Sequence, residues 1–330
     1  MSANNTSEIR QVASSSQQKA SAKQGKQQKD SSTKYYLPSR ETLSSLTSIP
    51  FVDTHTHLHY VLERLESTPL RLDNYSILRD THFPSNLEFC INVLCDPETF
   101  AGDTLFPNTF RDWRIQASEP YIYLAAGVHP HNAKVYNDYI ESLMLTILQH
   151  PKTVALGEIG LDYHYDNSPR DVQQQIFIRQ LKKAVELEKP IVIHTREAEQ
   201  DTYDILTKHV PSHWRIHVHC FTDSPEFAKS LIEFFPNLYI GITGVVTFGS
   251  AKNTQNTLRD LPISRILLET DAPFMIPSKL NRNRRSNEKV SVCHSGMIPF
   301  IAEKIAEIKG VEIGEIMRAA RENTRNMYGI

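Results

Sequence analysis

The sequence predicts a (β/α)8 barrel, the TIM-barrel fold, preceded by a disordered N-terminal tail. Eight short apolar runs lie between Phe51 and Glu269, and amphipathic stretches separate many of them. Eight strands that alternate with helices in a chain of 330 residues suit one large barrel. A doubly wound open sheet is the structural alternative, but no GxGxxG turn follows the first expected strand.

The expected tail covers residues 1–35 and the barrel domain covers residues 36–330. The tail is rich in Gln, Ser and Lys and has no periodic apolar pattern, so it cannot bury enough surface to offset the entropy cost of ordering. It has no apolar core of a secretory signal, and its single Arg argues against a mitochondrial transit peptide. A cytoplasmic or nuclear location is therefore expected.

The expected strands are short and rich in apolar and β-branched residues, as is typical of buried parallel strands. In chain order they are Phe51–Thr54, Glu88–Leu94, Tyr121–Ala126, Thr153–Leu156, Ile191–His194, Ile216–Val218, Leu238–Ile242 and Ile266–Glu269. Amphipathic helices are expected at Arg170–Glu188, Pro225–Phe235 and Ser295–Lys309, the second capped by Ser224. The segment Tyr60–Asn86 is expected to be an insertion or a long loop with helical pieces.

Composition and charge exclude several classes of protein. No run of about 18 apolar residues is present, so no membrane span is expected. The four cysteines lack CxxC spacing and disulfide density, which favours a reducing compartment. The net charge of −2 is close to neutral, so any contact with a nucleic acid must come from a local patch.

Five of the expected strand ends carry His, Glu or Asp. In a (β/α)8 barrel these ends converge on one face, where active sites lie. The residues are His55 and His57 after the first strand, Glu158 after the fourth, His194 after the fifth, His219 after the sixth and Asp271 after the eighth. Such ligands suit zinc, manganese, nickel or iron, and a bridging carboxylate allows two ions. Independent structural roles at all five places would be a rare coincidence, so the sequence predicts a divalent-metal site.

Strand alternation does not choose every ligand. His59 has the same parity as His55 and His57, and His217 has the same parity as His219. The position nearest the strand end favours His219, and for the same reason Asp271 is favoured over Glu269. Cys220 has the opposite parity and is expected to be a buried apolar residue.

Positive charge near the expected mouth predicts an anionic substrate. Arg196 follows His194 by two residues and is suited to bidentate phosphate binding. The loop after the eighth strand carries Lys279, Arg282, Arg284, Arg285 and Lys289. Loops at this place often hold phosphate in barrels. His129, in the stretch Gly127–His131, and the stretch Asp162–His164 are further candidates for substrate contact, although either could be structural.

Together these stretches resemble the TatD family of metal-dependent deoxyribonucleases, within the amidohydrolase-like barrel superfamily. The resemblance covers about residues 51–328 and rests on DTHTH, GVHPH, GEIGLDYH, IHTRE, HCFTD, GITG and ETDAPF, in that order. It implies two divalent ions: His55, His57 and Asp271 would hold one, His194 and His219 the other, and Glu158 would bridge them. It also implies Mg²⁺ as the activating ion, with Zn²⁺ or Mn²⁺ as alternatives.

The resulting functional hypothesis is a divalent-metal-dependent deoxyribonuclease of 3'-5' exonuclease type that acts on DNA or an oligonucleotide. Asp271 and Glu158 would be the catalytic carboxylates, and Arg196, His129, Arg284 and Arg285 would contact substrate or phosphate. Two alternatives stay open on the residues alone. One is a hydrolase of a small amide, lactone or aminated ring at the same metal site, and the other is a non-catalytic scaffold.

Overall fold

A computed structural model describes residues 34–68, 70, 72–102, 105, 109–282, 288–290 and 292–330. The predicted disordered tail lies outside these residues except for Lys34 and Tyr35. Residues 283–287 of the basic loop, among them Arg284 and Arg285, also lie outside.

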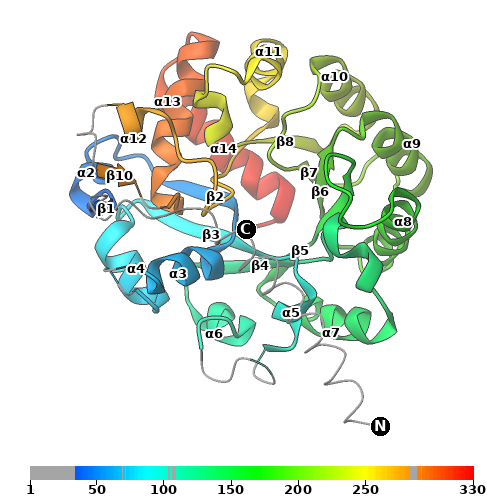
Figure 1. The fold of residues 1–330 in the computed structure, drawn as a ribbon. Helices are drawn as coiled ribbons and strands as arrows, with labels where there is room; N and C mark the ends of the chain where they lie inside the picture. Colours follow the sequence, from blue (N-terminus) through cyan, green and yellow to red (C-terminus); the bar gives the residue numbers. More distant parts are fainter. Residues whose placement is uncertain are drawn as a thin grey trace.

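Eight parallel strands form one barrel, in the spatial order of the sequence (Figure 1). They are β2 (Phe51–Thr56), β3 (Leu87–Leu94), β4 (Ile122–Ala126), β5 (Thr153–Asp162), β6 (Ile191–Arg196), β7 (Ile216–Val218), β8 (Leu238–Ile242) and β9 (Ile266–Leu268). The first and last strands meet through a parallel bridge between Thr56 and Ala272. The His57 N–H donates to Ala272 O at 2.8 Å, and the Asp271 N–H donates to His55 O at 2.9 Å. These bonds close the sheet, which confirms the barrel and excludes the open-sheet alternative.

All eight predicted strands are present, but β5 continues six residues beyond its predicted end. Glu158 therefore lies inside a strand and not in a turn that follows it. Gly157 and Gly160 have φ values of 149° and 146°, which side chains rarely adopt. The two glycines let the strand continue, with a shift of register against β6 between Leu156 and Ile159.

Helices surround the barrel in Figure 1, and they carry the apolar stripes that cover it. The α-helices are α2 (Arg40–Ser44), α3 (Leu58–Glu66), α4 (Tyr75–His82), α5 (Pro97–Phe100), α6 (Trp113–Ser118), α7 (Asp138–Leu148), α8 (Arg170–Glu186), α9 (Glu199–His209), α10 (Pro225–Phe234), α11 (Lys252–Asp260), α12 (Lys279–Arg282), α13 (Ile298–Lys309) and α14 (Ile313–Tyr328). Short 3-10 helices are η2 (Pro130–Val135), η3 (Gly244–Thr247), η4 (Ile263–Arg265) and η5 (Ser295–Met297).

The three predicted helices correspond to α8, α10 and η5 with α13. Ser224 caps α10 as expected, because its hydroxyl accepts a hydrogen bond from the Phe227 N–H at 3.2 Å. The predicted insertion contains α3 and α4 as its helical pieces. His59 lies in α3, so the strand parity that linked it to His55 does not apply.

The last helix, α14, covers the N-terminal end of the barrel, and the C-terminus lies near the centre of the ring in Figure 1. Asn323 donates to the carbonyl of Ile266, the first residue of β9, at 2.8 Å. Met327 and Tyr328 pack against inward-facing residues such as Val192 and Leu267. Since this end is closed by the helix, access to the barrel interior is from the opposite end.

Two short strands lie outside the barrel. β1 (Lys34–Tyr36) pairs in parallel with β10 (Glu288–Val290), so the start of the described chain lies beside the segment that follows β9. None of the described helices is long and apolar enough to cross a membrane.

Candidate metal centre

The six predicted ligands lie together at the C-terminal end of the barrel. They come from five strands or the residues that directly follow them, and each is almost completely buried except His194, which is partly exposed. The set consists of His55, His57, Glu158, His194, His219 and Asp271. The residues that strand parity and position had selected therefore lie in one cluster.

The carboxylate of Glu158 lies at the centre of this cluster. Its Oε1 is 2.7 Å from His194 Nδ1 and 2.6 Å from His219 Nε2. Its Oε2 is 3.5 Å from His55 Nε2 and 4.0 Å from His57 Nε2. Burial alone would raise the pKa of Glu158, but His219 and the other neighbouring histidines hold it well below its usual range. Each oxygen of one ionised carboxylate therefore faces a different pair of histidines.

The first pair, His55 and His57, is completed by Asp271. The two Nε2 atoms lie 3.4 Å apart, and Asp271 Oδ1 is 3.5 Å from His57 Nε2. His57 Nδ1 donates to the carbonyl of Val93 at 2.9 Å, so Nε2 is the nitrogen that faces the cluster. Burial and His219 lower the pKa of His55 to about 3. Burial alone would lower the pKa of His57, but Asp271 and Glu158 raise it to about 9.

The second pair is His194 and His219, whose Nδ1 and Nε2 atoms lie 3.3 Å apart. His194 Nε2 is 3.3 Å from Asp162 Oδ2 and Nδ1 faces Glu158, so each ring nitrogen lies beside a carboxylate oxygen. Burial alone would lower the pKa of His194, but Asp162 and Glu158 raise it to about 9. Burial alone would also lower the pKa of His219, but Glu158 raises it above its ordinary value.

These distances fit divalent ions. Two ligands bonded to one ion at about 2.1 Å and at the tetrahedral angle lie about 3.4 Å apart. The facing nitrogens lie 3.4 Å apart in one pair and 3.3 Å in the other. Two of the potential metal-binding groups among the described residues are His55 with His57 and Asp271, and His129 with Glu158 and His194.

His129 belongs to the second of these groups, but its hydrogen bond points to another role. Its Nδ1 accepts from the His131 N–H at 3.1 Å, so the neutral ring carries its proton on Nε2. That Nε2 is 3.5 Å from Glu158 Oε1. His129 is thus arranged as a hydrogen-bond donor at the edge of the cluster, which suits the predicted contact with substrate.

The cluster opens into a cavity of about 630 Å³. Its wall includes Arg196, as predicted. Cys220 also lines the wall and is only partly buried, so the expectation that it is a buried apolar residue was wrong. Sequence reasoning did not single out several other residues of the wall: Tyr60, Cys95, Asp96, Tyr165, Thr222, Phe274 and Met275. Tyr165 follows Asp162 by three residues, and Phe274 follows Asp271 by three residues. An aromatic residue three positions after a candidate acid was the signal that could have identified them.

Backbone geometry also marks this cavity. Five non-glycine residues with positive φ occur in the described chain, and Cys220, Asp271 and Met275 of these line the cavity. Their φ values are 45°, 50° and 52°. Residues held in such sparsely populated conformations cluster at functional sites.

Strand parity alone did not distinguish His217 from His219, or Glu269 from Asp271. His217 and Glu269 lie one layer deeper in the barrel than the six predicted ligands. His217 Nε2 is 2.8 Å from Glu269 Oε2, and its Nδ1 is 2.7 Å from the hydroxyl of Tyr328. The other oxygen of Glu269 accepts from the Cys220 N–H and lies 3.8 Å from His219 Nδ1. Burial raises the pKa of Glu269 to about 8. Neither His217 nor Glu269 lines the cavity.

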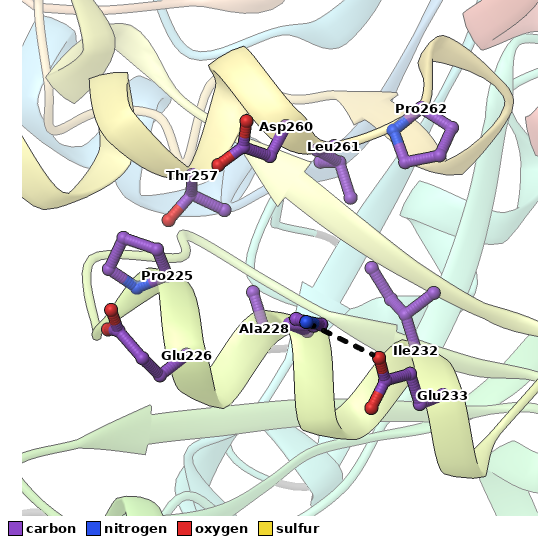
Figure 2. A pocket seen from close by; sticks show the side chains of 10 residues that line it. Pro225, Glu226, Ala228, Ile232, Glu233, Thr257, Asp260, Leu261 and Pro262 are labelled. Carbon is purple, nitrogen blue, oxygen red and sulfur yellow. Dashed lines mark ion pairs between the residues drawn. The ribbon is translucent and has the colours of Figure 1, made fainter.

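A second cavity of about 530 Å³ lies on the outside of the barrel, between α10 and α11 (Figure 2). Its wall contains Ile232 and Leu261, and the ion pair drawn there joins Lys229 to Glu233 at 3.8 Å. None of the ten residues that line it is a His or a Cys. This cavity therefore lacks the imidazole donors that line the cavity at the barrel mouth.

Imidazole and carboxylate donors around a central glutamate, at the open end of a closed (β/α)8 barrel, define a metal-dependent hydrolase of the barrel type. The chain belongs to the TatD-related DNase family, whose model matches residues 52–329.

Individual relatives agree with this assignment. The human protein named 3'-5' RNA nuclease TATDN2 is 37% identical over 284 residues, which cover 85% of this chain and 35% of that protein. The chain thus spans about a third of the length of that relative. A protein of Erwinia tasmaniensis named 3'-5' ssDNA/RNA exonuclease TatD is 32% identical over 212 residues, or 64% of this chain and 79% of that one. The crystal structure of the TatD homologue YJJV from Escherichia coli has the same fold, with a TM-score of 0.69 at 24% identity over 85% of this chain and 98% of that one.

Proposed function

We propose that this protein is a divalent-metal-dependent nuclease that hydrolyses phosphodiester bonds from the 3' end of a nucleic acid strand. The observation that carries the proposal is the position of Glu158, whose two oxygens face two separate histidine pairs. A carboxylate shared in this way suits a pair of divalent ions. The names of the human and Erwinia relatives support a nucleic acid substrate.

His55, His57 and Asp271 would hold one ion, His194 and His219 the other, and Glu158 would bridge the two. Mg²⁺ is the proposed ion, with Mn²⁺ or Zn²⁺ as alternatives. A pair of such ions lowers the pKa of water and stabilises charge on the phosphoryl and leaving oxygens.

Asp271 is the residue proposed to accept the proton of the attacking water. Burial alone would raise its pKa, but the hydrogen bond with His57 lowers it, so the carboxylate is ionised at neutral pH. Its backbone conformation, at a φ of 50°, helps to direct the side chain toward the cluster. An ionised carboxylate in this place can orient a water and take its proton.

Arg196 and His129 are proposed to bind the phosphate. Among the described residues, no carboxylate forms an ion pair with Arg196, so its guanidinium donors are available to an anion. Arg284 and Arg285 are retained as proposed phosphate contacts on the basis of the sequence. A nucleic acid substrate agrees with the cytoplasmic or nuclear location that the sequence favours.

The test is release of nucleotides from end-labelled single-stranded DNA and RNA by the purified chain with Mg²⁺, Mn²⁺ or Zn²⁺. Asp271→Asn should abolish release, because the amide cannot accept the proton. No release by the folded wild-type protein with any of these ions would refute the nuclease. Arg196→Gln separates this function from hydrolysis of a small neutral amide or lactone. A nuclease should lose affinity and part of its salt dependence, whereas a hydrolase of a neutral substrate should not.

A further inference from the structure

Two exposed aromatic rings line the cavity that contains the metal-ligand cluster. Tyr165 is 44% exposed and Phe274 is 41% exposed. Among the residues whose exposure the structure describes, the remaining aromatic side chain of comparable exposure is Phe234, on α10 outside this cavity. The two rings therefore present apolar surface to the cavity, which a ligand with a flat apolar face could cover.

Each ring carries an arginine on one face. The Cζ of Arg196 lies 5.1 Å from the ring centroid of Tyr165, and the Cζ of Arg64 lies 4.6 Å from that of Phe274. These distances are within the range of a cation–π contact. Arg64 Nη1 also donates to the carbonyl of Pro273 at 3.3 Å, which ties it to the segment that carries Phe274. The arginines fix the rings, and the exposure of each ring leaves surface for a ligand.

The two pairs lie on opposite sides of the barrel mouth. Tyr165 follows β5 and Phe274 follows β9, and these strands are four places apart in the eight-stranded order. Arg196 ends β6 and Arg64 lies in α3, after β2, so the arginines are also four strands apart. In a closed ring of eight strands, four places is half a turn. The metal-ligand cluster therefore lies between two equivalent aromatic–arginine pairs.

A local hydrogen bond holds Tyr165 beside the cluster. Its N–H donates to Asp162 Oδ1 at 3.3 Å, while the other oxygen of Asp162 faces His194 and His131 at 3.3 and 2.8 Å. The same carboxylate thus contacts a proposed ligand and the backbone of Tyr165, which carries one aromatic ring. A ring linked in this way to the reaction centre suits binding of the reacting molecule itself.

We propose that Tyr165 with Arg196 and Phe274 with Arg64 are two stacking platforms for successive nucleotides of a single strand, with the scissile phosphate between them. The inference rests on the proposed nuclease function. A single strand presents flat bases that alternate with phosphates, which matches rings, arginines and a central cluster. In a duplex the base faces are covered by their neighbours, so the platforms select single strands.

The test measures binding in the Asp271→Asn background, so that the strand is not consumed. Two probes are used: an oligonucleotide of about eight residues and an abasic strand of equal length and charge. Stacking on two rings predicts that the strand with bases binds at least about 25-fold more tightly than the abasic strand. Phe274→Leu and Tyr165→Leu should each reduce this preference about fivefold or more. Phe234→Leu is the matched control and should leave the preference intact.

Thermal unfolding of each variant shows that it is folded before its affinity is compared. An unchanged preference for bases in both ring variants, or an equal loss of affinity for the two strands, would overturn the platforms. Failure of the proposed hydrolysis can be distinguished from failure of the platforms. If the wild-type protein releases nucleotides but shows no preference for bases, the nuclease function stands and the platforms are wrong. If it prefers bases but releases nothing with any ion, the platforms stand and the hydrolysis is wrong.

Discussion

Replacement of Gly160 by alanine tests how strand β5 delivers Glu158 to the cluster. Gly160 pairs with His194 of β6 and has a φ of 146°. A Cβ atom on Gly160 would lie 1.9 Å from the carbonyl oxygen of His194, whereas real Cβ atoms essentially never come closer than 3.0 Å to another heavy atom. The β6 backbone would have to move by at least about 1.1 Å, in an interior that is close-packed.

The expected loss of stability has two parts. A side chain forced into this backbone conformation costs about 1–3 kcal/mol, and overpacking of a core costs about 1–3 kcal/mol. A loss of about 4 kcal/mol is therefore expected. With an unfolding entropy of about 2.1 cal/mol/K per residue, a domain of this size should unfold about 6 °C lower. The shift of β6 also moves His194, so added Mn²⁺ should raise the unfolding temperature less than it does in the wild-type protein.

Calorimetry with and without Mn²⁺ measures both effects. Gly249→Ala is the matched control, because a Cβ atom there meets nothing within 4 Å. It should unfold within about 2 °C of the wild-type protein. If Gly160→Ala also unfolds within this margin and keeps its response to Mn²⁺, the argument from the φ angle and the close approach is wrong.

Three further predictions concern protons and buried hydrogen bonds. His57 and His194 have pKa values of about 9 without ions, and the pKa of His219 is also raised. Calorimetry in buffers of different ionisation enthalpy should therefore detect release of at least about two protons on metal binding at pH 7. Metal affinity should rise with pH up to about 9, and a pH-independent affinity would contradict this. Burial lowers the pKa of His294 to about 3, so its contribution to stability is present above pH 6.5 and is lost as pH falls toward 3. His294→Asn should therefore lose about 2 kcal/mol less than wild type between pH 7 and pH 5 in urea unfolding, and parallel losses would refute the assignment. Tyr328→Phe removes the 2.7 Å bond to His217 and should cost about 1–2 kcal/mol in urea unfolding of the metal-free protein, whereas an unchanged midpoint would show that this bond contributes nothing.

The barrel and the grouping of histidines and carboxylates at its mouth were predictable because both follow from a local rule. Buried parallel strands appear as short apolar runs, and their C-terminal ends meet at one face. His55 and His57 lie in the cluster for this reason, as does His219. No long-range information was needed to group them, since the fold itself brings strand ends together.

Other features depend on contacts that the sequence does not display. The continuation of β5 through Glu158 requires two glycines in unusual conformations and a register shift against β6. From the sequence alone, the two glycines beside Glu158 therefore suggest a turn. Tyr165 and Phe274 became recognisable as a pair when the order of the strands placed them half a turn apart. The role of His129 depends on one hydrogen bond from a neighbouring backbone N–H.

Alternation along strands predicts two equivalent sets of histidine and acid, and burial decides between them. His217 and Glu269 repeat the pattern of His219 and Asp271 two residues earlier, so the side chains of both sets point into the barrel. In the deeper set, burial raises the pKa of Glu269 to about 8. In the upper set the bond to His57 keeps Asp271 ionised. The same residue types therefore differ with depth: burial dominates at Glu269 and raises its pKa, whereas the bond to His57 dominates at Asp271, at the mouth, and lowers its pKa.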